Sequence, residues 1–177
     1  MTIPRRGLAL ALALVLVSAF APAPVRAGTS APAPAPATAP GASAPNFAGR
    51  WRLDLTRSKL GKSRRVPVSR EDVIALDGRW LNVQSMSVRE GADTLRLAYR
   101  YCTDGDAVNK LMGQEVKTRG HREGGTQHFD SEAKLLLISL LVAERWTLSA
   151  DGRTLTMERE SRSPLGEDKQ VLRFARE

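Results

Sequence analysis

Apolar and polar residues alternate with a period of two through most of the chain, and this pattern restricts the possible fold most strongly. The alternation is clearest over residues 145–160, where a four-residue loop would place Leu148 opposite Leu155. The next facing pair is Trp146 and Met157, so the side chains on this face are all apolar. A shift of one residue would destroy the sorting, and the pattern therefore selects its own register. A period of two is that of a strand buried on one face, which predicts strands.

Further alternating stretches predict the other strands. They cover residues 47–55, 66–76, 79–88, 95–101 and 169–176. Asp77 and Gly78 give a two-residue hairpin signal, and with these two as the loop Ile74 would oppose Leu81. About eight or nine antiparallel strands and no long helix are expected. The apolar face needs cover, and closure also removes sheet edges, so we predict an all-β, up-and-down β-barrel, with a β-sandwich as the alternative.

The first 27 residues have the three-part pattern of a secretory signal peptide. Arg5 and Arg6 give a positive start, residues 8–20 form an apolar run, and residues 25–27 give a small-x-small end. The run is shorter than the ~20 residues of a membrane-spanning helix, so no membrane span is predicted. Cleavage after this segment would deliver the protein to the periplasm or outside the cell.

Residues 28–45 form a linker rich in Ala and Pro that carries no charge. This composition cannot bury a core, and its Ala-Pro repeats favour an extended polyproline II conformation. Residues 46–177 are long enough to form a core of their own. The predicted organisation is therefore a signal peptide, a linker and one β-barrel domain.

Positive charge is concentrated at the start of this domain. The chain has a formal net charge of +8, and residues 50–70 hold eight cations against one acid. A basic patch attracts phosphate-rich partners, which for an exported protein means an anionic envelope component rather than nucleic acid. A solvated loop and strand face is the alternative. The candidate contact residues are Arg57, Lys59, Lys62, Arg64 and Arg65.

Few residues carry reactive chemistry. Cys102 is the only cysteine, and we expect a buried small side chain rather than a disulfide partner or reactive thiol. A turn at residues 124–125 would set His121 opposite His128, which makes the two weak candidates for a metal site. A polar strand face, or a hairpin loosened at low pH by imidazolium repulsion, is the alternative. No phosphate loop, nucleophile elbow or zinc-protease motif occurs, which favours a non-catalytic protein without a cofactor.

A run of apolar residues at 135–142 breaks the alternation. In phase with Trp146, the inward residues are Leu136, Ile138, Leu140 and Val142. The outward residues are then Leu135, Leu137 and Leu141. Outward apolar side chains need cover, from another segment of the chain, from a second subunit in a homodimer or from a ligand.

Two segments resemble small secreted bacterial lipocalin-like proteins of the calycin type. Residues 47–61 look like the opening of these proteins, with a G-x-W motif at Gly49 and Trp51, and residues 145–159 look like their late hairpin. Residues 101–105 resemble a turn found in many of them. The resemblance implies a barrel whose base is closed by Gly49 and Trp51, with Arg173 of the last strand packed near the tryptophan.

The expected function is the binding of a small, mainly apolar ligand inside the barrel. The candidate lining residues are Leu95, Leu97, Tyr99, Tyr101, Leu136, Ile138 and Leu140. The same residues would serve equally well to fill a solid core. The alternative function is a filled barrel that acts as an envelope interaction module, for a protein partner, as a protease inhibitor or on an anionic surface.

Overall fold

The computed structural model describes residues 44–62, 66–89, 91, 94–135 and 138–177. The predicted signal peptide and most of the linker lie outside this range. The strands are β1 (Gly49–Leu53), β2 (Pro67–Asp77), β3 (Trp80–Arg89), β4 (Leu95–Cys102), β5 (Asp106–Leu111), β6 (Gln114–Glu123), β7 (Thr126–Leu135), β8 (Ile138–Leu148), β9 (Thr154–Ser163) and β10 (Gly166–Arg176). The described residues include no helix, and hence none that is long and apolar enough to cross a membrane.

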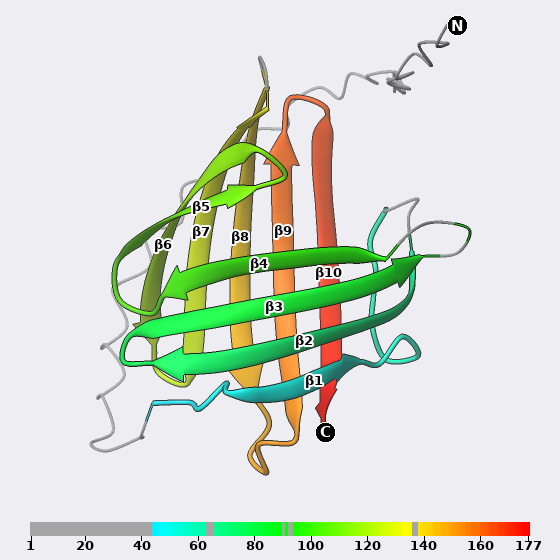
Figure 1. Ribbon diagram of the computed structural model, residues 1–177, viewed down its shortest axis with the longest axis vertical. Coiled ribbons are helices and arrows are strands. Elements are labelled where there is room, and N and C mark those ends of the chain that lie inside the picture. Colours follow the sequence, from blue (N-terminus) through cyan, green and yellow to red (C-terminus); the bar gives the residue numbers. More distant parts are fainter. Residues whose placement is uncertain (1–43, 63–65, 90, 92–93, 136–137) are drawn as a thin grey trace, which may run out of the picture. The chain divides into compact units, whose positions relative to one another are not determined.

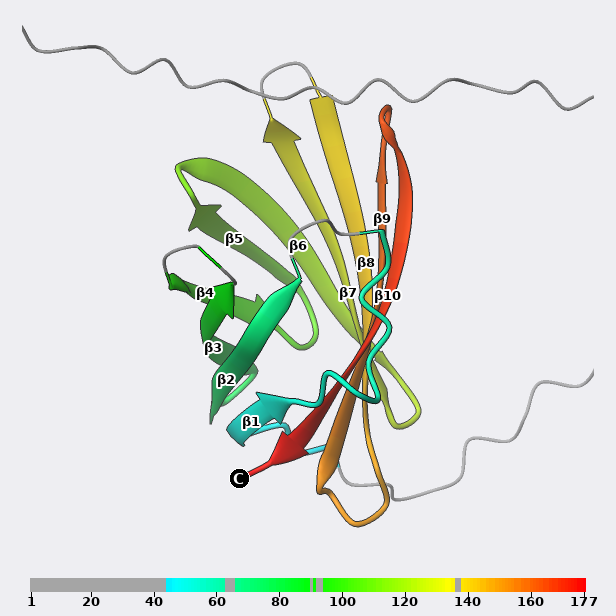
Figure 2. The same cartoon turned by 90° about the vertical axis from the view of Figure 1, so that its right-hand side faces the viewer.

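The strands form one antiparallel sheet in the order β4-β3-β2-β1-β10-β9-β8-β7-β6-β5. Strands adjacent in sequence pair with each other except β4 and β5, which are the two edges of the sheet. β1 also pairs with β10, and the sheet curls into a nearly closed barrel (Figure 1). Figure 2 shows β2–β4 facing β7–β10 across the interior. The predicted all-β, up-and-down barrel is confirmed, with ten strands rather than eight or nine. The short β5 carries Asn109 on its inward face, which weakens its apolar alternation.

The register of the β8–β9 hairpin is the predicted one. Leu148 pairs with Leu155 and Trp146 with Met157. Three of these four side chains are almost completely buried, and Leu148 packs against them at the edge of the core. Sorting of side chains by face therefore identified this register correctly.

The turn between β2 and β3 lies one position later than predicted, at Gly78 and Arg79. Ile74 consequently pairs with Val83 and not with Leu81. Gly78 has a φ of +57°, which glycine adopts without steric cost and which suits the first central position of a two-residue turn. The register differs from the predicted one by two residues, so Ile74, Leu76, Leu81 and Val83 still share one face of the sheet.

One end of the barrel, called the closed end here, is filled with large side chains. Its buried residues include Phe47, Trp51, Ile74, Leu81, Phe129, Trp146, Leu155 and Phe174. Trp146 has edge-to-face contacts with the rings of Phe47 and Phe129, at centroid distances of 5.8 and 5.1 Å. Edge-to-face packing favours the ring quadrupoles and fixes the rings relative to one another.

Trp51 seals the closed end, and its cationic partner is Arg176. The indole Nε1 of Trp51 donates to the carbonyl oxygen of Phe47 at 2.8 Å. The guanidinium of Arg176 lies 4.4 Å from the Trp51 ring centroid and donates to the carbonyl oxygens of Asn46, Ala48 and Gly152. A cation over an indole face is attracted by the ring's π electrons.

Arg173 does not have the position that the resemblance implied. Its Nη1 donates to the carbonyl oxygen of Arg57, in the loop after β1. Leu172 and Phe174 are buried, and Arg176 shares their parity along β10, whereas Arg173 has the opposite parity. Alternation therefore directs Arg173 away from the interior and brings Arg176 to Trp51.

Candidate functional site

The opposite end of the barrel, called the open end here, contains a cavity of about 340 Å³. Its aliphatic lining comes from strand ends and from the loop after β1: Leu53, Leu60, Val66, Leu95, Leu97, Leu111 and Leu172. Leu95 and Leu97 lie at the start of β4, and Leu111 ends β5. Leu53 and Leu172 are buried and line the cavity from inside, whereas Leu95, Leu97 and Leu111 are partly exposed at its entrance. The cavity is therefore suited to an apolar body.

The floor of the cavity is polar and contains two arginines. One of them, Arg70 on β2, binds the buried carboxylate of Asp72 with two hydrogen bonds. Its Nε donates to Oδ1 at 3.0 Å and its Nη2 to Oδ2 at 2.7 Å. Its guanidinium carbon also lies 5.3 Å from the ring centroid of Phe174. A fork of two parallel hydrogen bonds fixes the orientation of the guanidinium.

The other arginine, Arg159 on β9, pairs with Glu144 directly across the β8–β9 ladder. Its Nε donates to Oε1 of Glu144 at 2.6 Å. The second carboxylate oxygen, Oε2, accepts from the Tyr101 hydroxyl and from the Trp146 indole, each at 3.1 Å. Glu144 is only 3 % exposed, and this carboxylate links the packed core to the cavity floor.

The surroundings of these groups fix their protonation. Burial raises the pKa of Glu144, but the charge and hydrogen bonds of Arg159, with smaller effects from Arg70 and Trp146, bring the pKa below its ordinary value overall. Burial raises the pKa of Tyr99 and Tyr101 above the ordinary tyrosine value, and the charge of Glu144 raises that of Tyr101 further. At neutral pH the floor therefore holds ion pairs and two neutral phenols.

The barrel closes at the seam between β4 and β5 through a side chain instead of a backbone ladder. The side-chain Oδ1 of Asn109 accepts from the backbone N–H of Arg100, and its Nδ2 donates to the Arg100 carbonyl, both at 2.9 Å. The amide of Asn109 thus takes the place of a peptide group from a neighbouring strand.

Close approach of β4 and β6 seals the seam next to the closed end. A Cβ on Gly120 would lie 1.8 Å from the carbonyl oxygen of Cys102, so only glycine fits there. The Gln127 amide donates to the carbonyl oxygen of Thr103 at 2.7 Å. Cys102 itself is buried, as the sequence predicted for a small side chain.

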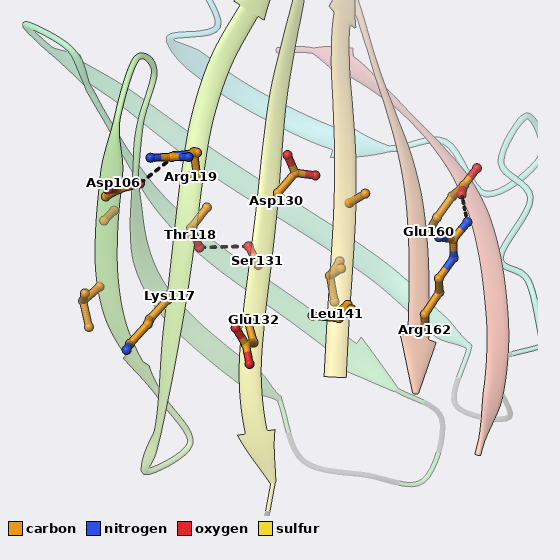
Figure 3. A pocket seen from close by; sticks show the side chains of 14 residues that line it. Asp106, Lys117, Thr118, Arg119, Asp130, Ser131, Glu132, Leu141, Glu160 and Arg162 are labelled. Atoms are coloured by element: carbon orange, nitrogen blue, oxygen red, sulfur yellow. Dashed lines mark hydrogen bonds and ion pairs between the residues drawn. The ribbon is translucent and has the colours of Figure 1, made fainter. Parts of the chain in front are cut away.

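A larger hollow, of about 720 Å³, lies on the outer surface over β5–β9 (Figure 3). Its side chains include the exposed ion pair of Asp106 with Arg119, whose closest atoms are 3.1 Å apart. Leu141, one of the three leucines predicted to point outward, lies here and is half exposed. The charges of this hollow are mixed and solvated, whereas the interior cavity brings its polar groups out of water. The interior cavity is therefore the stronger candidate for a binding site.

The structure brings four of the seven predicted ligand-binding residues together. Leu95, Leu97, Tyr99 and Tyr101 line the cavity on β4. Ile138 and Leu140 are half-buried on β8 and are not among its lining residues, and Leu136 lies outside the described residues. The rest of the lining comes from the end of β1 and the loop after it, and from β2, β3, β5, β9 and β10.

The remaining candidate residues lie elsewhere on the molecule. Arg57, Lys59 and Lys62 are exposed in the loop after β1, and Arg64 and Arg65 lie outside the described residues. The rings of His121 and His128 are stacked, with centroids 4.7 Å apart. Within the described ranges, no three or more His, Cys, Asp or Glu side chains are grouped so that they could hold a metal ion.

Sequence reasoning missed the two arginines of the floor and their two buried carboxylate partners, although the pattern contained a signal. In the predicted β8–β9 register, the next pair after Trp146 and Met157 on the inward face is Glu144 and Arg159. Alternation along the two strands therefore places these two opposite charges next to each other on the inward face. Asp72 likewise has the parity of the buried Ile74 on β2. Extending the alternation past the last apolar residue would have placed these charges inside the barrel.

No protein-family model matches the chain, and no curated protein matches it in sequence. Among solved structures, human cRBP IV has a TM-score of 0.46 at 11 % identity, over 75 % of this chain and 98 % of its own. A mutant of the fluorescent protein UnaG has a TM-score of 0.49 at 12 % identity, over 74 % of this chain and 96 % of its own. Secretory abundant heat soluble protein 4 from Ramazzottius varieornatus has a TM-score of 0.49 at 10 % identity, over 77 % of this chain and 99 % of its own. What this barrel does is therefore inferred from its own geometry.

Proposed function

We propose that the protein is an exported carrier that binds a small, mainly apolar ligand in the open end of its barrel. The observation that supports this most directly is a cavity with an aliphatic entrance and a polar floor. A volume of about 340 Å³ lies within the range of about 300–1,000 Å³ for small-molecule sites. The signal-peptide pattern of residues 1–27 supports export to the periplasm or the medium.

Polar groups on the floor would determine the orientation of a bound ligand. An apolar ligand body would pack against Leu95, Leu97 and Leu111, while hydrogen-bonding groups of the floor would orient one polar end. Ion pairs hold the side chains of the floor in place, so their arrangement exists before a ligand binds. A preorganised site loses less conformational entropy when its ligand binds.

Titration with Nile red, a neutral dye whose emission rises in apolar surroundings, tests this function. We expect saturable binding to the wild-type protein. Leu97→Trp should weaken it by more than about tenfold, because the indole fills the space that the dye needs. Leu141→Trp is the matched control, since Leu141 is exposed on the outer surface. An absence of saturable binding, or an equal loss in both folded variants, would reject the cavity as the site.

The exposed cations of the loop after β1 support a second prediction, contact with an anionic envelope component. Arg57, Lys59 and Lys62 are exposed and form no ion pair with another described residue. Free exposed cations favour a contact with an anionic envelope component, screened by salt. This contact would not need the interior cavity and does not compete with the proposed ligand.

A further inference from the structure

Resting on the proposed function, we infer that the cavity selects ligands whose buried end is an uncharged hydrogen-bond acceptor, such as an alcohol, carbonyl or ester, over ligands whose buried end is a carboxylate. The inference comes from how the charges of the floor are paired.

The two cations of the floor already have anionic partners. Arg70 binds Asp72 and Arg159 binds Glu144, so these four groups have no net charge between them. An entering carboxylate would meet no unpaired guanidinium there, because the charge of each arginine is already balanced by the buried carboxylate of Asp72 or Glu144. Its loss of hydration would remain uncompensated, which is the costly case for a buried charge.

Hydrogen-bond donors nevertheless remain available to the ligand. Each guanidinium binds its carboxylate through Nε and Nη2, and neither Nη1 makes a hydrogen bond within the described part of the chain. The Tyr99 hydroxyl also lacks a partner among the described residues. No completely buried side-chain polar atom lacks a partner there, so these free donors face open space. Arginine nitrogens only donate, and the complementary ligand group is therefore an acceptor.

Among the described residues, the remaining cation that lines the cavity is Arg89, at the end of β3. A carboxylate held by Arg89 would stay at the entrance, and the ligand's apolar end would then face the polar floor. An acceptor placed on the floor satisfies the free donors and leaves the apolar body against the leucines. The second orientation leaves fewer polar groups without partners.

A matched series of ligands tests the inference. A medium-chain fatty alcohol, its methyl ester and the fatty acid of equal chain length are titrated by displacement of Nile red, at neutral pH and below their aggregation concentrations. We expect the alcohol and the ester to bind more than about tenfold more tightly than the ionised acid. Repeating the series with Arg89→Gln removes binding of the acid at the entrance.

Glu144→Gln supplies the reverse test, because it leaves Arg159 without its anionic partner. Affinity for the fatty acid should rise by about tenfold or more, while affinity for the alcohol changes little. The double variant Glu144→Gln with Arg159→Gln is the control and should return to the wild-type preference. Asp72→Asn repeats the test beside Arg70 if Glu144→Gln does not fold.

The outcomes separate the two proposals. If the folded wild-type protein binds none of the three ligands and no dye, the proposed function fails. If it binds the acid as tightly as the alcohol in the Arg89→Gln background, the carrier function stands and the inference on selectivity is overturned. Failure of both folded single variants to gain affinity for the acid overturns it as well.

Discussion

Glu144 shows how one side chain serves both halves of the interior. It accepts hydrogen bonds from Tyr101 and Trp146, which belong to the packed core, and from Arg159, which lines the cavity. Moving Arg159 would leave Oε1 of this buried carboxylate without a partner, and moving Tyr101 or Trp146 would remove one of the two donors to Oε2. The carboxylate thus couples the geometry of the cavity floor to the packing of the closed end.

Acid should destabilise the protein partly through this residue. The folded pKa of Glu144 lies below its ordinary value of about 4.3, so its stabilising contribution is present above that pH and is lost as pH falls through the folded pKa. We expect the wild-type free energy of unfolding to decline more steeply below about pH 4 than that of Glu144→Gln. Urea titrations from neutral to acid pH measure this.

Glu158→Gln is the matched control for that comparison. Glu158 forms an exposed ion pair with Arg145, with 3.1 Å between the closest atoms, on the outer face of the same hairpin. Its replacement should alter stability by less than about 1 kcal/mol, whereas Glu144→Gln should cost about 3–5 kcal/mol at neutral pH. Equal effects of the two changes would show that the inner carboxylate is not stabilised by its partners.

At the scale of the strands, β4 and β5 are the two edges of the sheet and meet without a backbone ladder. Asn109 holds them together by satisfying both backbone groups of Arg100. Edges of a sheet are ordinarily paired, covered or charged. Here one side-chain amide completes the barrel beside the cavity.

Asn109→Ala should therefore loosen the seam. It removes two hydrogen bonds and leaves the N–H and C=O of Arg100 without partners, which we expect to cost about 1–3 kcal/mol. Hydrogen exchange at the Arg100 amide should accelerate, while β8 and β9 remain protected. Asn82→Ala, on the exposed face of β3, is the control. Unchanged exchange at Arg100 in Asn109→Ala would mean that the side chain does not join the strands.

The arrangement of the strands could be predicted largely from local alternation. Trp146 and Met157 define the β8–β9 register because a slip would expose them, and no distant contact is needed to see this. The β2–β3 turn was misplaced because two adjacent pairs of residues, at 77–78 and 78–79, both contain Gly78. The choice between them depends on backbone conformation, which the pattern of side chains does not report.

The site could be predicted only in part. Leu95, Leu97 and Tyr99 alternate along one strand and were placed in the lining on that basis. Arg70 and Asp72 look like polar positions of a solvated strand, because charged residues are rarely buried without a partner. The ion pairs become recognisable only when alternation is extended through charged positions, and the curvature that leaves a cavity beside them depends on all ten strands.

At the scale of the whole domain, the barrel is filled at one end and hollow at the other. Large aromatic residues occupy the closed end, and the open end keeps a cavity of about 340 Å³. The boundary runs through the two ion pairs. Packing and binding are therefore carried out by different halves of one sheet.

Export is the prediction that concerns the complete chain. When the protein is produced in a bacterial periplasm, the denatured mass should correspond to a mature chain that starts at Gly28. Replacing the small residue Ala27 by Phe should block or displace the cleavage. A mature protein that retains residues 1–27 would refute the assignment of the signal peptide. Native mass spectra of the same sample would also distinguish a monomer from a homodimer, which is one of the alternatives for covering the outward leucines.

The separation of a packed base from a lined cavity has a consequence for how such a protein can change. Substitutions at Leu95, Leu97 or Leu111 alter the shape of the entrance and leave the interlocked rings around Trp146 untouched. Substitutions at the entrance can therefore change ligand specificity while the packed core continues to stabilise the fold. Libraries randomised at those three leucines should yield many folded members with diverse ligands.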